Sequence, residues 1–402
     1  MTTSRVPSGF QRLSYADWTS REAVAIARCF LTGQVHSGSA PAKLALALGA
    51  LYAPSEVKLL NTAHHGIAMG LHCFKQRKPE RTEVIVPAYI CPSVPQTVRA
   101  CGLHVRFVDV QDDLNLSADA VKQALGPNTL AVIAPHMYGS PAPIAEIEQV
   151  CRGAGIALID DAAQVVGVRA NGRLLGTFGD MGVISFAQSK AIVTGVRGSG
   201  GVVLVNDPGL SEQINAQCMQ LAPAQGRPVA LLDFLLNDLC RRFTGGLGHH
   251  LARLLPTLLG DKRAPVSASA LSNMDASTAL VQLARMPEMV QEKTRISNLY
   301  WQALRQFPEF KFPQYLDGRY LSRLMLLMPE CVNIERFRKN ALKAGVETRL
   351  GYTMDHNVVG MAPNAALMVN RLIGVPSRKG MTETDVLNVC RRLHQSVSES
   401  HF

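Results

Sequence analysis

Two short segments place charged side chains directly after apolar runs, where they could take part in chemistry. In the first, residues 156–159 are apolar and are followed by Asp160 and Asp161. In open α/β sheets, ligands bind at the carboxyl ends of the strands. A carboxylate at such an edge is poorly solvated unless it meets a cation or a hydrogen-bond donor. The two acids are therefore candidate ligand-binding groups, and the alternative is that one of them is a helix N-cap.

The second segment ends a further apolar run and supplies an amine. It contains Ser185 and, five positions later, Lys190. A lysine held in a partly apolar cleft can lose its proton and act as a nucleophile. The glycine-rich residues 195–201 permit close approach of the backbone to a ligand, or a reversal into the next strand. A solvated surface lysine is the alternative.

Together these residue types match the requirements of pyridoxal phosphate. That cofactor needs a lysine for its Schiff base, a carboxylate under its pyridine nitrogen and a cradle for its phosphate. Lys190 supplies the first and Asp161 the second. They are 190 − 161 = 29 residues apart, which leaves room for a turn, a hairpin-like excursion and one strand. We therefore expect two neighbouring strand ends to face one ring.

Short apolar runs rich in β-branched residues alternate with helical patterns through the first half of the chain. They lie at residues 84–87, 105–110, 130–135, 156–160, 182–186 and 202–205. Strands that are apolar at nearly every position are typical of a mostly parallel sheet covered on both faces. The pattern predicts an α/β domain with crossover helices, followed by a second, smaller α/β unit.

The composition limits the class of protein. With 402 residues, the chain has room for two or three domains at about 150 residues each. A content of 47% hydrophobic and 18% charged residues indicates a globular protein. The net charge of +10 favours anionic partners, but the basic residues are dispersed, which argues against nucleic acid.

Cysteine usage and the absence of targeting signals indicate the compartment. The nine cysteines form no C-x-x-C pair, which is typical of reduced thiols in a cytoplasmic protein. No Cys/His cluster has zinc spacing, so no metal site is expected. The sequence shows neither a signal peptide nor an apolar run of the ~18 residues that a spanning helix needs.

Several segments match, in order and spacing, a known group of enzymes. They are residues 84–94, 105–110, 135–139, 160–167, 174–190, 201–207, 279–286, 346–356 and 375–386. The chain resembles the DegT-type (DnrJ/StrS-like) sugar aminotransferases over roughly residues 61–392. The resemblance implies fold type I of the pyridoxal-phosphate enzymes. Such a fold has a large domain, with a mostly parallel mixed seven-stranded sheet between helices, and a smaller C-terminal α/β domain.

The resemblance also implies a division of the chain. Residues 1–54 are expected to contribute to the small domain and to dimer contacts. Residues 55–270 form the large cofactor-binding domain, which includes a helical apolar insertion at about 211–268. Residues 271–402 form the small C-terminal domain.

The resemblance assigns roles to the strand-end residues. Lys190 falls on the family's aldimine lysine, and Asp161 on the acid under the pyridine nitrogen. Gln164 falls on the amide near the ring hydroxyl, and Ser185 on the phosphate-binding hydroxyl.

Further residues fall on less regular positions of the family. Thr62 and Ala63 replace its small-residue turn at a helix start, where backbone N–H groups suit a phosphate. Cys91 falls on the residue that stacks on the cofactor, with Tyr89 nearby as the alternative. His136 and His356 are candidate substrate contacts, and the alternative for His136 is a structural histidine.

Two departures concern the phosphate. The family's asparagine that reaches the partner subunit's phosphate is missing, and Asn273 is a candidate replacement. Arg197, in the loop after Lys190, is a second candidate to compensate for the missing phosphate contact. His64 and His65 follow the phosphate turn, where one of them could reach the cofactor or both could lie on the helix surface.

The expected function is transfer of an amino group from a donor, glutamate by resemblance, to a keto sugar linked to a nucleotide. The family's sites form between two subunits, so a homodimer is expected. One alternative is a dehydratase, although the dehydrating relatives commonly have histidine where this chain has Lys190. Another is an enzyme for a non-sugar or lipid-linked ketone. The last is a degenerate cofactor-binding protein that contacts a membrane surface or a partner through residues 225–260.

Overall fold

The computed structural model describes most of the chain. The described residues are 9–14, 16–195, 199–228, 231–232, 235–236, 267–313, 320–354, 358 and 360–400. Arg197, His356 and most of the segment 225–260 lie outside them. The predictions made for these residues therefore stay predictions.

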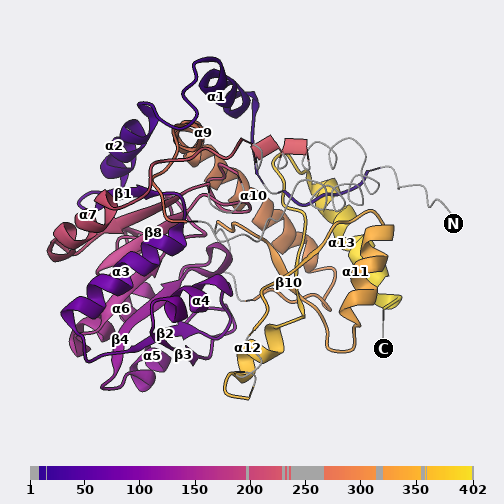
Figure 1. Cartoon of the computed structure of the whole chain (residues 1–402). Helices are drawn as coiled ribbons and strands as arrows, with labels where there is room; N and C mark the ends of the chain where they lie inside the picture. Colours follow the sequence, from indigo (N-terminus) through magenta and orange to yellow (C-terminus); the bar gives the residue numbers. More distant parts are fainter. Residues whose placement is uncertain are drawn as a thin grey trace.

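A seven-stranded sheet forms the centre of the larger domain (Figure 1). Its order is β1 (Glu56–Leu60), β9 (Gly201–Val205), β8 (Met181–Ser185), β5 (Ala157–Asp161), β4 (Thr129–Pro135), β2 (Glu83–Pro87) and β3 (His104–Val108). Strand β9 runs antiparallel to both of its neighbours, and the other pairs are parallel. The predicted mostly parallel, mixed sheet is confirmed.

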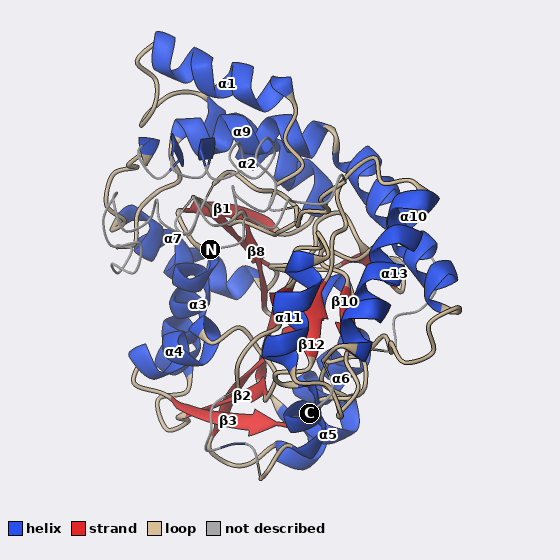
Figure 2. Cartoon of the chain, turned by 90° about the vertical axis from the view of Figure 1, so that its right-hand side faces the viewer, coloured by secondary structure: helices blue, strands red, loops and turns tan. Residues whose placement is uncertain are grey.

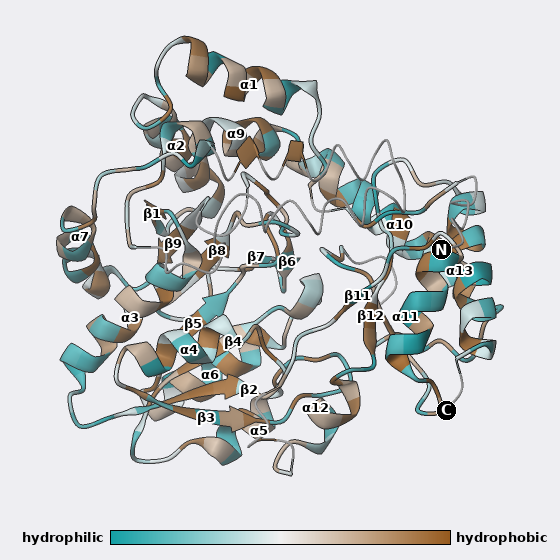
Figure 3. Ribbon diagram, turned by 45° about the vertical axis from the view of Figure 1, so that its right-hand side comes forward, coloured by the Kyte–Doolittle hydropathy of each residue, from teal (hydrophilic) through white to brown (hydrophobic). Residues whose placement is uncertain are grey.

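Helices cover both faces of this sheet, and alternate strand residues supply the two cores. One core contains Ile159, Val183 and Val203 and packs against α3 (Ala63–Arg77), α4 (Ser93–Ala100) and α7 (Ser211–Met219). The other contains Leu158, Ile184 and Leu204 and packs against α2 (Ala40–Tyr52), α5 (Ala118–Ala124), α6 (Ile144–Ala154) and α9 (Asn273–Ala284). This two-sided burial explains why the strands are apolar at nearly every position. In Figure 3 the strands are accordingly brown and many outer helix faces teal.

The smaller domain has a core of its own. An antiparallel sheet in the order β10 (Met325–Leu327), β12 (Leu372–Gly374), β11 (Arg349–Leu350) packs with α10 (Met286–Leu304), α11 (Ile334–Lys343) and α13 (Glu383–Ser398). Helices α11 and α13 lie beside these strands in Figure 2. Short elements complete the described chain. They are the β6 (Arg169–Ala170) and β7 (Arg173–Leu174) hairpin, α12 (Pro363–Met368), and the 3₁₀ turns η1 (Met137–Gly139) and η2 (Pro208–Leu210).

The N-terminal segment contacts both domains. The backbone of Gln11 pairs with the small domain, with its N–H 2.8 Å from the Gly345 carbonyl oxygen. Helix α1 (Ser20–Leu31) packs on α9, and the carboxylate of Glu22 forms a buried ion pair with Arg285 at the end of that helix. Because α9 contributes Ala276 to the large-domain core, that core extends beyond residue 270, where the sequence placed the boundary.

Within the described residues, no helix is both long and apolar enough to cross a bilayer.

Candidate active site

The polar segments of the sequence meet at one edge of the large sheet. Strands β8, β5, β4 and β2 are parallel neighbours, so their carboxyl ends lie together. Asp161 at the end of β5 is in register with Val183 of β8, and Ser185 ends β8 two residues later. Lys190 follows five residues after this end and is half-buried. The sheet order therefore brings the predicted amine and acid to neighbouring strand ends.

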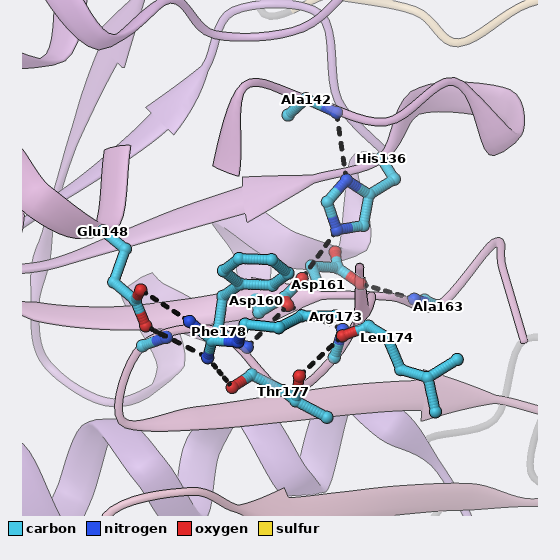
Figure 4. A network of polar contacts seen from close by, with 12 residues as sticks. His136, Ala142, Glu148, Asp160, Asp161, Ala163, Arg173, Leu174, Thr177 and Phe178 are labelled. Carbon is cyan, nitrogen blue, oxygen red and sulfur yellow. Dashed lines mark hydrogen bonds and ion pairs between the residues drawn. The ribbon is translucent and has the colours of Figure 1, made fainter. Parts of the chain in front are cut away.

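Asp160 is a fully buried carboxylate whose oxygens are both engaged (Figure 4). Its Oδ1 lies 2.6 Å from Nε2 of His136, and its Oδ2 accepts hydrogen bonds from the amides of Gly176, at 2.6 Å, and Phe178, at 3.1 Å. The other ring nitrogen of His136 accepts from the Ala142 amide at 3.1 Å, so the proton is on Nε2 and is donated to Asp160. This network fixes the ends of β4 and β5.

Asp161, the next residue, has a different environment. It is 6% exposed, and its Oδ1 accepts one hydrogen bond, at 3.0 Å, from the Ala163 amide. Burial raises the pKa of Asp161 above its usual value, and the positive charge of Lys190 is the largest opposing influence, ahead of His136 and His64. The charge of Lys190 thus acts on Asp161, as expected if both groups face one ligand.

Gln164 holds an acceptor that no group of the described chain satisfies. Its amide nitrogen donates to the Met137 sulfur at 3.5 Å, whereas its Oε1 is buried and has no hydrogen-bond partner among the described residues. Leaving a buried acceptor unpaired costs about 1–3 kcal/mol. An incoming hydroxyl would remove this penalty.

The N-terminus of α3 forms the far end of the site. Thr62 caps the helix by accepting a hydrogen bond from the His64 amide at 3.1 Å. Ser185 pairs with Gly201 across β8 and β9, and a Cβ atom on Gly201 would lie 2.3 Å from the Ala63 nitrogen. Glycine is therefore required for the strands to approach the helix start. The free N–H groups of a helix N-terminus suit an anionic group.

A chain of polar side chains connects this helix start with α4. The Nδ1 atom of His64 lies 3.2 Å from the Thr62 hydroxyl, and its Nε2 lies 2.6 Å from the Ser93 hydroxyl. Ser93 in turn lies 3.0 Å from the Cys91 sulfur. His65 contacts Asn61 instead, with Nδ1 3.0 Å from Oδ1. Ser93 is not among the residues predicted from the sequence. Its position two residues after Cys91 was the one signal that it lies near the site.

Tyr89 lies in a cluster between the two domains. It is fully buried, its hydroxyl is 2.7 Å from the Tyr138 hydroxyl, and it accepts a hydrogen bond from the Tyr352 amide at 2.9 Å. The side chain thus ties β2 to the small domain. A cofactor contact by Tyr89 or Cys91 stays a prediction, and Cys91 is the one that the polar chain links to His64.

The other predicted residues vary in their outcome. His136 is fully buried with both ring nitrogens engaged, which matches the structural alternative; a substrate contact for it stays a prediction. The carbonyl of Asn273 accepts from Ala40 at 2.9 Å, and its amide donates to Gln34 at 2.7 Å. Asn273 therefore holds the N-terminal segment, and a contact of this residue with a partner subunit's phosphate stays a prediction. The described residues contain no group of side chains that could hold a metal ion.

Taken together, this donor set fits pyridoxal phosphate. Asp161 and Lys190 would meet the ring from adjacent strand ends, and the orphaned Gln164 oxygen would accept from the ring hydroxyl. The start of α3 at Ala63, which Gly201 approaches closely, would hold the phosphate together with Ser185, the strand partner of Gly201.

Comparison with known proteins agrees with this chemistry. The profile of the DegT/DnrJ/EryC1/StrS aminotransferase family matches residues 17–394. GDP-perosamine synthase of Vibrio cholerae is 32% identical over 168 residues, which are 41% of this chain and 44% of that protein. A 4-aminotransferase of Saccharopolyspora spinosa, named for dTDP-4-dehydro-2,3,6-trideoxy-D-glucose, is 25% identical over 80% of this chain and 79% of its own length.

Solved structures share the fold. PseC of Helicobacter pylori, an aminotransferase of pseudoaminic acid biosynthesis, superposes with a TM-score of 0.75 at 16% identity, over 97% of this chain and 100% of that chain. The aminotransferase TlmJ of Streptoalloteichus hindustanus gives a TM-score of 0.73 at 24% identity over the same shares.

Proposed function

The chain belongs to the DegT/DnrJ/EryC1/StrS aminotransferase family, and from this premise we propose that it transfers an amino group to a keto sugar carried on a nucleotide. The observation that carries the proposal is the placement of buried Asp161 and of Lys190 after the carboxyl ends of the neighbouring parallel strands β5 and β8. Named relatives that act on GDP- and dTDP-linked sugars support the acceptor class. Retention of Lys190 favours transfer over dehydration.

Pyridoxal phosphate, when bound, supplies an electron sink that makes the α-hydrogen of an amine removable. Asp161 would keep a proton on the ring nitrogen, because a buried carboxylate gains most from a cationic neighbour. The amine of Lys190 would take and return the proton at the substrate carbon. Gln164 would orient the ring, and Ser185 with the amides at Thr62 and Ala63 would hold the phosphate.

We extend the proposal to a cytoplasmic homodimer with shared active sites. Apolar side chains are exposed on α1 and α2, among them Leu31, with 88% of its surface exposed, and Leu46, with 77%. Val24 and Phe30 of α1 add to this surface. An interface at α1 and α2 would bury these apolar side chains, as protein interfaces do. Sedimentation at increasing concentration, with and without Leu31→Glu, tests the dimer.

A spectral half-reaction tests the activity. The purified protein is loaded with pyridoxal phosphate, and the visible band of lysine-bound cofactor is followed as glutamate is added. We expect the band to decline and to return when a keto sugar linked to GDP, dTDP or UDP follows. Lys190→Ala should lack the initial band. A wild-type band that responds to no amino donor would contradict the proposal.

A further inference from the structure

Lys190 lies in the middle of a closed loop. The loop runs from Phe186 to Thr194, and the Thr194 amide donates a hydrogen bond to the Phe186 carbonyl at 2.9 Å. The lysine is four residues from each of these ends (190 − 186 and 194 − 190). Ser189, the residue before it, has a left-handed backbone with φ of 62°. Residues other than glycine seldom adopt this conformation, and it persists where the surrounding structure holds it in place.

The side-chain amide of Gln282 holds one residue of this loop at two points. Its Oε1 accepts a hydrogen bond from the Val193 amide at 2.9 Å, and its Nε2 donates to the Val193 carbonyl at 2.7 Å. Gln282 belongs to α9 and is separated from Val193 by 89 positions of the sequence. Because this side chain satisfies both the N–H and the C=O of one residue, it takes the place of a neighbouring β-strand.

A second donor reaches the same carbonyl from the N-terminal segment. Nε1 of Trp18 donates a hydrogen bond to the Val193 oxygen at 2.7 Å. Trp18 precedes α1, which packs on α9 (Figure 2). The Val193 side chain belongs to one apolar cluster with Ile26 of α1 and Met274 of α9. The contacts of Gln282 and Trp18 together form the Val193 anchor, which lies three residues after the lysine.

Burial keeps water from replacing the contacts of the anchor. Val193 has 2% of its surface exposed, and Gln282 has 1%. A buried peptide group that loses its partner gains none from solvent, so the loop would have to move to find one. The two residues between Val193 and the lysine, Ala191 and Ile192, are buried in the large-domain core. A displacement of Val193 would therefore reach the backbone of Lys190.

We propose that Gln282 is a positioning residue for Lys190 and that it acts through Val193, together with Trp18. A lysine amine is carried on a flexible four-carbon stem, so it reaches one place reproducibly only if the backbone that carries it is fixed. The inference rests on the proposed function, in which this amine takes and returns a proton at the substrate carbon. A displacement of about 1 Å can lower the rate of such a step by about 100-fold.

Hydrogen exchange of the cofactor-free protein tests the anchor without any reaction. Gln282→Leu keeps a side chain of similar size and removes both hydrogen bonds to Val193. We expect amide exchange in residues 187–194 to accelerate by about 10-fold or more, the factor that corresponds to the loss of one net hydrogen bond. Exchange in β4, two strands away from β8, should not change. Acceleration of the same size in both segments would overturn the inference, because the effect would then be global.

Single-turnover kinetics test what the anchor does for the lysine. At saturating glutamate, the rate constant for decline of the cofactor band should fall by about 10- to 100-fold in Gln282→Leu. The glutamate concentration that gives half the maximal rate should change by less than about twofold. A loss of active protein lowers the amplitude of this reaction and not its rate constant. Glutamate deuterated at its α-carbon should slow Gln282→Leu more than wild type, because proton transfer then limits the rate.

A milder variant decides the case in which Gln282→Leu does not fold. Trp18→Phe removes one of the two donors to the Val193 carbonyl and leaves the other. It should change exchange and rate constant in the same directions by about two- to fivefold. Asn340→Leu is the control, since it removes a side-chain amide that donates to the Glu399 carbonyl in the small domain, and it should behave as wild type. If neither variant that folds changes the rate constant, the inference is overturned.

The measurements separate this inference from the proposed function. In a protein that transfers no amino group, the function would be refuted. The anchor would still be supported if Gln282→Leu accelerated exchange only in residues 187–194 and slowed the appearance of the band on addition of pyridoxal phosphate. Amino transfer by the wild type at a rate constant that Gln282→Leu leaves unchanged would refute the anchor alone.

Discussion

Asp160 and Asp161 are neighbours at the carboxyl end of β5, but the polar groups around them differ in how completely they are hydrogen-bonded. Each carboxylate oxygen of Asp160 has a hydrogen-bond partner at 2.6 Å. One of these partners, His136, accepts a further hydrogen bond from the Ala142 amide. Around Asp161 the carboxyl group has a raised pKa, and the buried oxygen of Gln164 lacks a partner in the described chain. Buried polar groups whose hydrogen bonds are complete stabilise the fold, whereas those that lack a partner are candidates for ligand binding.

The difference between the two acids follows from the alternation of a strand. Asp160 lies on the face of Leu158, which packs in the core with α6 and α9, whereas Asp161 lies on the face of Ile159, toward α3. Consecutive residues of one strand thus serve opposite sides of the sheet. On one side both oxygens of Asp160 have hydrogen-bond partners, and on the other side Asp161 accepts one hydrogen bond, from the Ala163 amide.

Replacing Lys190 gives the largest expected effect. Lys190→Ala removes both the covalent anchor of the cofactor and the proton carrier, so we expect the rate of amino transfer to fall by at least about 10⁴-fold. The free energy of unfolding of the ligand-free protein should change by less than about 1 kcal/mol, because Lys190 is only half-buried. Urea denaturation checks stability and steady-state assays check the rate. A variant that loses stability and rate together would place Lys190 with the Asp160 network.

The next prediction concerns stability and addresses Asp160. Asparagine keeps only one acceptor oxygen, so in Asp160→Asn either the amides of Gly176 and Phe178 or the Nε2–H of His136 lose their acceptor and face an NH₂ group. We expect a loss of about 3 kcal/mol in the free energy of unfolding, measured by urea denaturation. Asp161→Asn, one residue away, is the matched control, and its free energy of unfolding should fall little. Equal losses in both variants would remove the distinction between the two acids.

A pH series sharpens the same comparison for Asp161. Burial raises its pKa above the usual 3.8, so ionisation of this group opposes folding of the ligand-free protein. The destabilisation by ionised Asp161 is absent below pH 3.8 and is complete above the raised pKa that Asp161 has in the folded state. Ligand-free Asp161→Asn should therefore gain stability relative to wild type as the pH rises through this window. With cofactor the order should reverse, since the protonated ring nitrogen pairs with the carboxylate. Thermal unfolding of both proteins across the pH range, with and without pyridoxal phosphate, measures these two effects. A stability difference between Asp161→Asn and wild type that is the same at every pH would contradict ionisation of Asp161 as its cause.

The smallest expected effect is at the polar chain beside α3. Ser93→Ala removes the 2.6 Å contact to His64 and the 3.0 Å contact to Cys91. One neutral hydrogen bond contributes about 1 kcal/mol, so we expect the dissociation constant of the cofactor to rise about fivefold. Fluorescence titration of the stripped protein with pyridoxal phosphate measures this. Ser297→Ala, in α10 of the small domain, is a control that should leave the constant unchanged.

The sequence was sufficient for the sheet and for placing Asp161 and Lys190 after neighbouring strand ends, because short apolar runs that end in polar residues define a strand edge. It did not show what Asp160 does, since the donors that hold this carboxylate, Gly176 and Phe178, come from a later turn. The ambiguity of His136 has the same origin. Its partners become visible only when β4 and β5 are paired.

Long-range packing accounts for the other omissions. The buried pair of Glu22 and Arg285 joins residues 263 positions apart, for which local patterns carry no signal. The tyrosine cluster of Tyr89, Tyr138 and Tyr352 likewise spans both domains.

The contact between Gly201 and the start of α3 has a consequence for how freely this protein can vary. Even a methyl group at position 201 would come within 2.4 Å of the Thr62 carbonyl carbon and force the strand from the helix. The anion site that we propose at this helix start would thus depend on the missing Cβ atom of Gly201 as much as on the groups that bind. Homologues that keep the chemistry should tolerate change on the outer surfaces of these helices long before they tolerate any side chain at that one position.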